Sequence, residues 1–326
     1  MSALFLLEPA TFAVTRVHPG QLLHTVYIRC TKSANSLTGA SHRATVRSMT
    51  TQTRTVRPGD RLPVDVLIQS ALWSMPVLWN WEDYLENDSF VVVEQAGELL
   101  GALFAWADES PVAWVRLAAL DSRMHIEGWL ELVLPGVLNS LRCRGVRKLA
   151  WMDYRNWVGP HLEAWGFIPL TDVVTLAKYD RALPRSGAPA ARVHPAQEQD
   201  LPALVAVDRA AFEPYWWNSM ETYRRRMAAS SYFVCAELGG RVVGFAEGDT
   251  HWPRAHVNRL AVHPSWQTRG IGTLLLNHIS RALWRAGATH ITLNTQADNL
   301  GSLRLYGRLG FEPVGDRVTA WQLALQ

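Results

Sequence analysis

The chain has 326 residues, of which 48% are hydrophobic and 19% charged, and it contains 15 tryptophans. This length exceeds the size at which a single core usually stops growing, and the composition excludes a disordered chain, so we expect two globular domains. Residues 1–55 hold six of the 32 basic and one of the 29 acidic residues, leaving 26 basic and 28 acidic residues elsewhere. Because that balance gives no global positive field, we expect no nucleic-acid partner.

The three cysteines, Cys30, Cys143 and Cys235, lie far apart and form no CxxC or Cys/His ligand spacing. This predicts neither a disulfide framework nor a zinc site, and it favours a reducing cytoplasm. Apolar stretches fall well short of the roughly 20 residues that cross a bilayer, and Met1–Leu7 lacks a basic region. We therefore expect a cytoplasmic protein with no metal, signal peptide or membrane partner.

Residues 1–55 are predicted to be an extension outside the first domain. From Pro9 to Gly59 there is no acidic residue, and Ser, Thr and Arg are frequent without apolar periodicity. This composition is close to that of an organellar transit peptide. Two other interpretations stay open, a disordered tail and a true translation start at Met49, with ordered structure beginning at Val56.

Beyond the extension, segments recur at an offset of about 143 residues, which predicts a tandem duplication. The matching pairs are Phe90–Gly101 with Phe233–Gly244, Arg116–Ala118 with Arg259–Ala261, Gly145–Trp151 with Gly287–Leu293, and Gly166–Pro169 with Gly310–Pro313. The predicted domains are residues 56–180 and 192–326. Residues 181–191 are rich in Pro, Gly and Ala, as expected for a linker.

In the second copy, His256–Val262 is predicted to be a strand, and the apolar spacing from Ile271 to Ala286 predicts an amphipathic helix. The loop Gln267–Gly272 lies between them. Its glycines permit close backbone approach, and the amides and dipole at the start of the helix favour a pyrophosphate. A second predicted strand, Ile291–Thr295, leads through Asn-x-x-Ser-x-x-Leu-Tyr-x-x-x-Gly-Phe into a short helix.

The segment Leu-Ala-Val-x-Pro-x-x-Gln-x-x-Gly-x-Gly, followed by the Asn-to-Phe pattern above, resembles the GNAT N-acetyltransferase superfamily. The resemblance covers 193–325 well and 56–180 in degraded form. It implies an α/β (α+β) fold class with two tandem domains, each a mixed twisted sheet flanked by helices. It also implies that acetyl-CoA, as co-substrate, lies in a V-shaped gap between two diverging strands.

The resemblance assigns roles residue by residue. The Val262 N–H would bind the thioester carbonyl, Asn299 would contact the pantetheine arm, and Tyr306 would reprotonate the departing thiolate. The residues that would bind acetyl-CoA are Leu260, Ala261, Val262, Gln267, Thr268, Arg269, Gly270, Ile271, Gly272, Asn299 and Tyr306.

An amine acceptor must lose a proton before it attacks, because its pKa near 10 keeps it protonated at neutral pH. Strand alternation places Glu247, Asp249 and His251 on one face, and Glu247 is the first candidate base. The alternatives are that these are ordinary solvent-facing polar residues, or that a water chain serves as the base. The aromatic segment 212–217 either walls an acceptor pocket or fills the space between the domains.

The function predicted is transfer of an acetyl group from acetyl-CoA to a primary amine of a small molecule or peptide by direct attack on the thioester. The alternatives are a non-catalytic acyl-CoA-binding regulator and a transferase with a longer acyl donor. The N-terminal copy is expected not to bind acetyl-CoA, because Glu127 and Leu130 stand at the positions of Arg269 and Gly272. Leu162 stands at the position of Tyr306.

Overall fold

The computed structural model describes residues 51–76, 81–184 and 190–326. The predicted extension up to residue 50, with its alternative start at Met49, and residues 185–189 of the predicted linker lie outside the described residues. The helices and strands of the N-terminal half are β1 (Gln52–Thr55), α1 (Arg61–Ser70), β2 (Trp73–Pro76), β3 (Phe90–Gln95), β4 (Glu98–Trp106), β5 (Val112–Leu120), α2 (Ile126–Cys143), β6 (Lys148–Asp153), α3 (Gly159–Leu162) and β7 (Ile168–Lys178).

The C-terminal half repeats this order of elements, except that α5 stands where the N-terminal half has β2. They are β8 (Arg192–Pro195), α4 (Leu201–Ala211), the short 3-10 helix η6 (Pro214–Trp216), α5 (Met220–Ala229), β9 (Tyr232–Leu238), β10 (Arg241–His251), β11 (Arg254–Val262), α6 (Ile271–Arg285), β12 (His290–Gln296), α7 (Leu300–Arg308) and β13 (Glu312–Ala324). No helix within the described ranges is long and apolar enough to cross a membrane.

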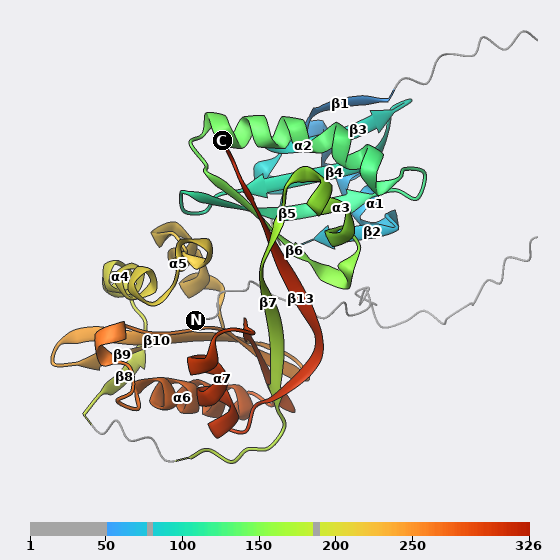
Figure 1. Ribbon diagram of the computed structural model, residues 1–326. Coiled ribbons are helices and arrows are strands. Elements are labelled where there is room, and N and C mark those ends of the chain that lie inside the picture. Colours follow the sequence, from blue (N-terminus) through green and yellow to red (C-terminus); the bar gives the residue numbers. More distant parts are fainter. Residues whose placement is uncertain (1–50, 77–80, 185–189) are drawn as a thin grey trace, which may run out of the picture.

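The described strands form one mixed sheet that runs through both halves, in the order β1-β3-β4-β5-β6-β13-β7-β12-β11-β10-β9-β8, with β2 on β5. Neighbouring strands are antiparallel except β5 with β6 and β11 with β12. The last strand of each half crosses to the other. β7 pairs with β12, and β13 pairs with β6. Figure 1 shows β7 and β13 side by side between the halves.

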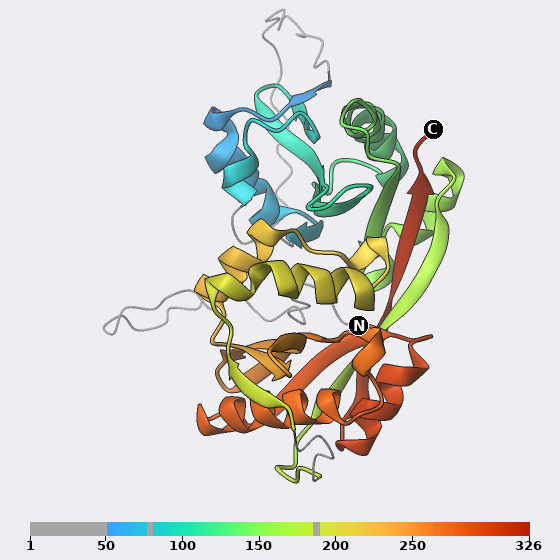
Figure 2. The same cartoon turned by 90° about the vertical axis from the view of Figure 1, so that its left-hand side faces the viewer.

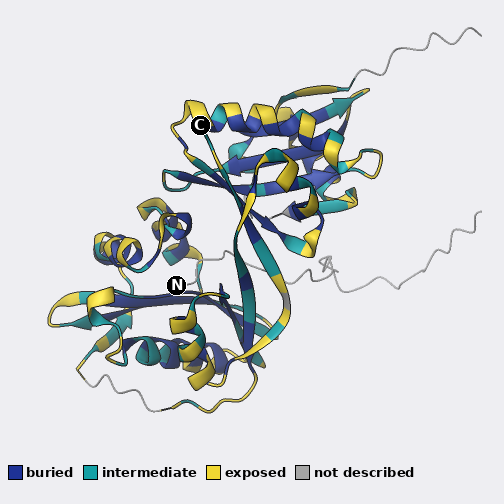
Figure 3. Cartoon of the chain, in the orientation of Figure 1, coloured by how far each residue is buried: buried dark blue, intermediate teal, exposed yellow. Residues whose placement is uncertain are grey.

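A shared apolar core closes the junction between the halves. Val112 and Trp114 of β5 pack in one cluster with Leu204, Phe212 and Trp216 from the α4 region. Figure 2 shows α4 lying between the two halves, and Figure 3 shows that the central strands of both halves are buried. The two repeats therefore share a continuous sheet and a common core.

Helix α6 illustrates how local sequence produces an element. Gly270 has a φ of 82° and precedes the first helical residue, and Gly287, with a φ of 93°, follows the end of the helix. Glycine adopts such left-handed conformations without steric cost. The apolar side chains at helical spacing face the sheet and are fully buried, namely Ile271, Leu275, Leu276, Ile279 and Leu283. Their burial explains why this helix covers the sheet with one face.

The boundary of the N-terminal extension needs a correction. Residues 52–55 were expected to belong to it, but they form β1, which pairs with Val91–Glu94 of β3. Arg54 binds Asp60 at 2.6 Å and Glu94 at 2.8 Å, both through half-buried ion pairs. The acids that pair with this strand lie outside the acid-poor segment, so the composition of the segment alone did not indicate its partner.

The strand exchange predicts that the C-terminal half does not fold by itself. A fragment of residues 190–326 lacks β6 and β7, so both edges of β13 and one edge of β12 lose their partners. We expect no cooperative thermal transition by circular dichroism, because unpaired buried strand edges are costly. Co-expression with residues 51–184 should restore the transition. Cooperative melting of the isolated fragment would contradict this interpretation.

Candidate active site

Strands β11 and β12 diverge halfway along their length. Their parallel ladder joins Arg254–Val257 to His290–Leu293 and ends there, although β11 continues to Val262. Beyond that point β12 stays paired with β7, and β11 stays paired with β10. Among the described strands none pairs with the other edge of Leu260–Val262. The predicted V-shaped gap is present in the backbone.

The direction of the Val262 N–H follows from its neighbour. The His263 N–H donates to the Val243 carbonyl, on the β10 side, at 2.9 Å. Because successive N–H groups of a strand point to opposite edges, the Val262 N–H points into the gap. The Val262 carbonyl lies on the same edge and accepts a hydrogen bond from Gln267 Nε2 at 3.0 Å. One edge amide is thus presented to any ligand in the gap.

The loop before α6 is shaped for an anion. Thr268 and Gly270 have φ values of 61° and 82°, which fold the backbone tightly around the start of the helix. Within the described part of the chain, no side chain caps the N-terminus of α6. The first amides of this 15-residue helix are therefore available, and its dipole favours negative charge. A Cβ on Gly272 would lie 3.1 Å from Leu305, so glycine permits the close packing of α6 on α7.

These features meet in one pocket of about 670 Å³. Its lining comprises Ala211, Leu260, Val262, Gln267, Thr268, Arg269, Gly270, Gly272, Thr273, Gly301, Ser302, Leu305, Tyr306 and Arg308. Eight of the eleven predicted acetyl-CoA residues are among them. Ala261 and Ile271 contribute buried side chains to the cores instead. Arg308, which the sequence analysis missed, adds a second cation to the lining. The guanidinium of the first, Arg269, lies 4.8 Å from the centre of the Trp266 ring.

Helix α7 brings Tyr306 to the lining of this pocket. Its side chain is 1% exposed and packs on Phe311, with ring centres 6.1 Å apart. The predicted pantetheine ligand Asn299 does not line the pocket. Its Oδ1 accepts from the Ser302 N–H at 3.1 Å and so caps α7. In the structure Asn299 fixes the helix that carries Tyr306.

Glu247 does not line the pocket and lies in a buried polar cluster beside α5, on the face of the sheet opposite α6. Its Oε1 pairs with Arg226 Nε at 3.0 Å and accepts from the Ser230 hydroxyl at 2.7 Å. Its Oε2 has no hydrogen-bond partner among the described residues. The Asn258 amide lies 3.4 Å from Glu247 and 2.6 Å from Asp249, so these two acids share a face, as the alternation predicted.

Helix α5 carries three consecutive arginines, Arg224–Arg226, a run of charge that is ordinarily a solvated helix face. Arg224 does bind exposed acids, Glu198 and Glu221. Arg226 is instead 8% exposed and pairs with Glu247. The helical periodicity turns one member of the run inward, and the buried carboxylate compensates its charge.

His256 extends this cluster and was not identified as a candidate from the sequence. Its Nδ1 lies 2.7 Å from the Thr292 hydroxyl, which itself donates to the Ala255 carbonyl at 3.2 Å. The hydroxyl therefore accepts from Nδ1–H, which leaves the lone pair on Nε2. Burial, reinforced by His251, lowers the pKa of His256 to about 4. The imidazole is neutral at pH 7.

The N-terminal half has the same strand divergence, but its gap is filled. β5 pairs with β6 only at Val112–Trp114, and β2 lies antiparallel to Leu117–Leu120 on the same edge. Residues 116–118 are those that match 259–261 in the repeat, so β2 covers the counterpart of the open β11 edge. Trp73 of β2 stacks on Trp157 at 5.7 Å. The chain thus supplies its own strand where the other half leaves a gap.

The aromatic segment between α4 and α5 lies at the junction of the halves. Trp114 Nε1 donates to the Tyr215 carbonyl at 2.7 Å, and the Trp114 and Trp216 rings lie 5.0 Å apart. Tyr215 and Trp216 are both less than 9% exposed. The sequence analysis left open whether this segment walls an acceptor pocket or fills the space between the domains. Tyr215 and Trp216 fill the space between the domains.

Comparison with known proteins agrees with this geometry. The model of the acetyltransferase (GNAT) family matches residues 199–311. An uncharacterized N-acetyltransferase of Methanocaldococcus jannaschii is 32% identical over 114 residues, which cover 35% of this chain and 72% of that protein.

Two solved structures share the fold over both halves. A GCN5-related N-acetyltransferase from Sphaerobacter thermophilus has a TM-score of 0.62 at 17% identity, covering 85% of this chain and 96% of its own. A tandem GNAT protein from the clavulanic acid biosynthesis pathway has a TM-score of 0.61 at 16% identity, covering 85% and 99%. The predicted fold class is confirmed, and the chain belongs to the GNAT family of acetyltransferases, enzymes of acyl transfer.

Proposed function

We propose that this acyltransferase transfers an acetyl group from acetyl-CoA to a primary amine of a small molecule or peptide, by direct attack on the thioester. The observation that carries the proposal is that the outward-facing Val262 N–H and the uncapped start of α6 flank one pocket of about 670 Å³. When bound, acetyl-CoA supplies the activated acetyl thioester. The residues of the pocket supply binding, orientation and charge stabilisation.

The loop Gln267–Gly272 would hold the pyrophosphate through backbone N–H groups, with Arg269 and Arg308 adding positive charge. The edge of Leu260–Val262 would bind the pantetheine arm as an added strand, since its edge groups face the gap. This accounts for a glycine-rich loop and an open strand edge in the same pocket.

The Val262 N–H would stabilise negative charge that develops on the thioester carbonyl oxygen. A preorganised donor of this kind is worth about 3 kcal/mol in comparable acyl transfers. The Tyr306 hydroxyl would donate a proton to the departing thiolate sulfur, and its place in the pocket favours turnover over mere binding of acyl-CoA.

Glu247 stays our candidate for the base, with its Oε2 atom as the proton acceptor. Its Oε1 is occupied by Arg226 and Ser230, whereas Oε2 has no described partner. A proton from the amine nitrogen would reach Oε2 through water, since Glu247 does not line the pocket.

The proposed function is tested by titrating the protein with acetyl-CoA and then measuring thiol release with spermidine, glucosamine and a peptide with an unblocked N-terminus. We expect saturable binding and amine-dependent release. Binding without release from any amine would indicate an acyl-CoA-binding regulator. Faster release from butyryl-CoA than from acetyl-CoA would indicate a longer acyl donor.

Gly270→Glu is predicted to weaken acetyl-CoA binding by about a hundredfold or more, because a carboxylate would face the pyrophosphate. Isothermal titration measures the affinity. Gly270→Ala controls for backbone strain at a φ of 82°, and Gly128→Glu places the same charge at the matching position of the other half. Equal affinity of Gly270→Glu and Gly270→Ala would show that the loop does not bind the phosphates.

Tyr306→Phe is predicted to lower kcat by about ten- to a thousandfold, the range for loss of a general acid, without changing acetyl-CoA affinity. The ring and its packing on Phe311 stay, and only the hydroxyl is lost. Tyr179→Phe, at a ring that is 66% exposed, is the matched control. An unchanged kcat, with chemistry rate-limiting, would assign Tyr306 to packing alone.

A further inference from the structure

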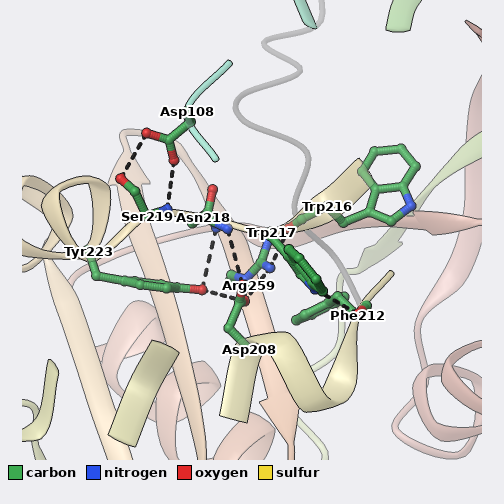
Figure 4. A network of polar contacts seen from close by, with 9 residues as sticks. All are labelled: Asp108, Asp208, Phe212, Trp216, Trp217, Asn218, Ser219, Tyr223 and Arg259. Carbon is green, nitrogen blue, oxygen red and sulfur yellow. Dashed lines mark hydrogen bonds and ion pairs between the residues drawn. The ribbon is translucent and has the colours of Figure 1, made fainter. Parts of the chain in front are cut away.

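The carboxylate of Asp108, in the N-terminal half, binds the start of α5 in the C-terminal half. The Ser219 N–H donates to its Oδ2 at 2.8 Å, and the Ser219 hydroxyl donates to its Oδ1 at 2.9 Å. The Thr222 hydroxyl donates to the same Oδ1 at 2.7 Å. An anion at this end also suits the helix dipole. One acid from the first repeat thus fixes the first turn of α5, as Figure 4 shows for Ser219.

The charge of Asp108 is balanced from its own half. Arg116, on β5, interacts electrostatically with Asp108. Burial lowers the pKa of Arg116, and the negative charge of Asp108 opposes that shift. Arg116 is also the residue that matches Arg259 in the repeat. The first copy therefore keeps a partly buried cation at the same place in its sheet, beside an anion that reaches the other half.

Next to Ser219 in the chain, Asn218 belongs to a buried hydrogen-bond network that reaches β11. The Asn218 N–H and the Tyr223 hydroxyl both donate to Asp208, at 3.1 and 2.5 Å. Burial raises the pKa of Tyr223 well above its usual value, so the hydroxyl keeps its proton. Arg259 donates to the same Asp208 and, at 2.6 Å, to the Trp216 carbonyl. Figure 4 shows these side chains converging between α4 and β11.

This network borders the pocket at two positions. Arg259 precedes Leu260, and Phe212, which lies 4.0 Å from the Arg259 guanidinium, follows Ala211. Leu260 and Ala211 both line the pocket. Phe212 and Trp216 pack with Ala261 in one core, whereas α6 packs with Leu260 in another, so the segment 212–219 lies on the face of β11 opposite α6 and next to the pocket.

We propose that Asp108 is a positioning residue for the acceptor: the first repeat holds the segment 212–219 against β11 and thereby shapes the side from which the amine reaches the thioester. This inference rests on the proposed function. In this proposal the N-terminal repeat contributes to catalysis by positioning the segment 212–219 through the Asp108 carboxylate, without binding a cofactor itself.

The test compares Asp108→Asn and Asp108→Glu with Glu109→Gln in the full chain. Glu109 also bridges the halves, through a partly exposed ion pair with Arg209 at 3.0 Å, so it is the matched control. For the amine of the panel with the fastest thiol release, we expect Asp108→Asn to raise KM about tenfold, the effect of losing a charged hydrogen-bond set. In Asp108→Asn we expect kcat and acetyl-CoA affinity to change less than twofold. Asp108→Glu, which keeps the charge, should give a smaller rise in KM than Asp108→Asn.

Hydrogen exchange supplies a readout that needs no acceptor. Asp108→Asn should speed exchange at the Ser219 amide while the amides of α6 keep their protection. If Asp108→Asn does not fold, Thr222→Val removes one of the three bonds and should give a smaller rise in KM.

Unchanged KM and unchanged exchange at Ser219 would overturn the inference, and so would a parallel loss of acetyl-CoA affinity, which indicates general destabilisation. If none of the amines causes thiol release by the wild-type chain, the proposed function fails. Hydrogen exchange at Ser219 alone then decides whether Asp108 holds the segment 212–219.

Discussion

The divergence of β11 and β12 after the Val257–Leu293 pair is the constraint on which the site depends. Backbone groups on a strand edge need partners, and an edge left open inside a fold is costly unless a ligand, water or another strand satisfies it. In the C-terminal half, Gln267 binds the Val262 carbonyl while the Val262 N–H faces the pocket. In the N-terminal half, β2 pairs with the corresponding edge of β5. The two repeats meet one requirement in two ways.

The filled repeat is joined to the open one by more than a linker. β7 and β13 exchange places in the sheet, so each half completes the other's hydrogen-bond ladder. Trp114 and Asp108 then reach across to the segment between α4 and α5. The buried pair of Arg259 and Asp208 connects that segment to β11, and removal of one partner from such a pair typically costs about 3–5 kcal/mol. The N-terminal half, in which β2 fills the gap between the strands, therefore still has a structural role in the C-terminal half.

Local features of the site were predictable from the sequence. The strand, glycine-rich loop and helix from His256 to Ala286 have short-range signals, and so does the helix that carries Tyr306. The pocket brings these residues together as expected. The repeat offset also matched β5 to β11, because both strands keep the same Arg-Leu-Ala sequence.

Partners distant in the sequence were not predictable. Arg226 looked solvated until the fold placed Glu247 against it, and Asp108 has its partners 111 and 114 residues away. β2 carries no alternation that distinguishes a gap-filling strand from a loop. Asn299 has the right position in the family pattern, but its side chain caps α7. These outcomes depend on tertiary pairing, which propensity and periodicity do not encode.

The central claim is that one strand edge is open to acetyl-CoA and that the other is closed by β2. Calorimetric titration of the full chain with acetyl-CoA tests it most directly, because stoichiometry counts the available edges without knowledge of the acceptor. The account predicts one acetyl-CoA per chain. A stoichiometry near two would show that β2 yields its place on β5 and would contradict the account.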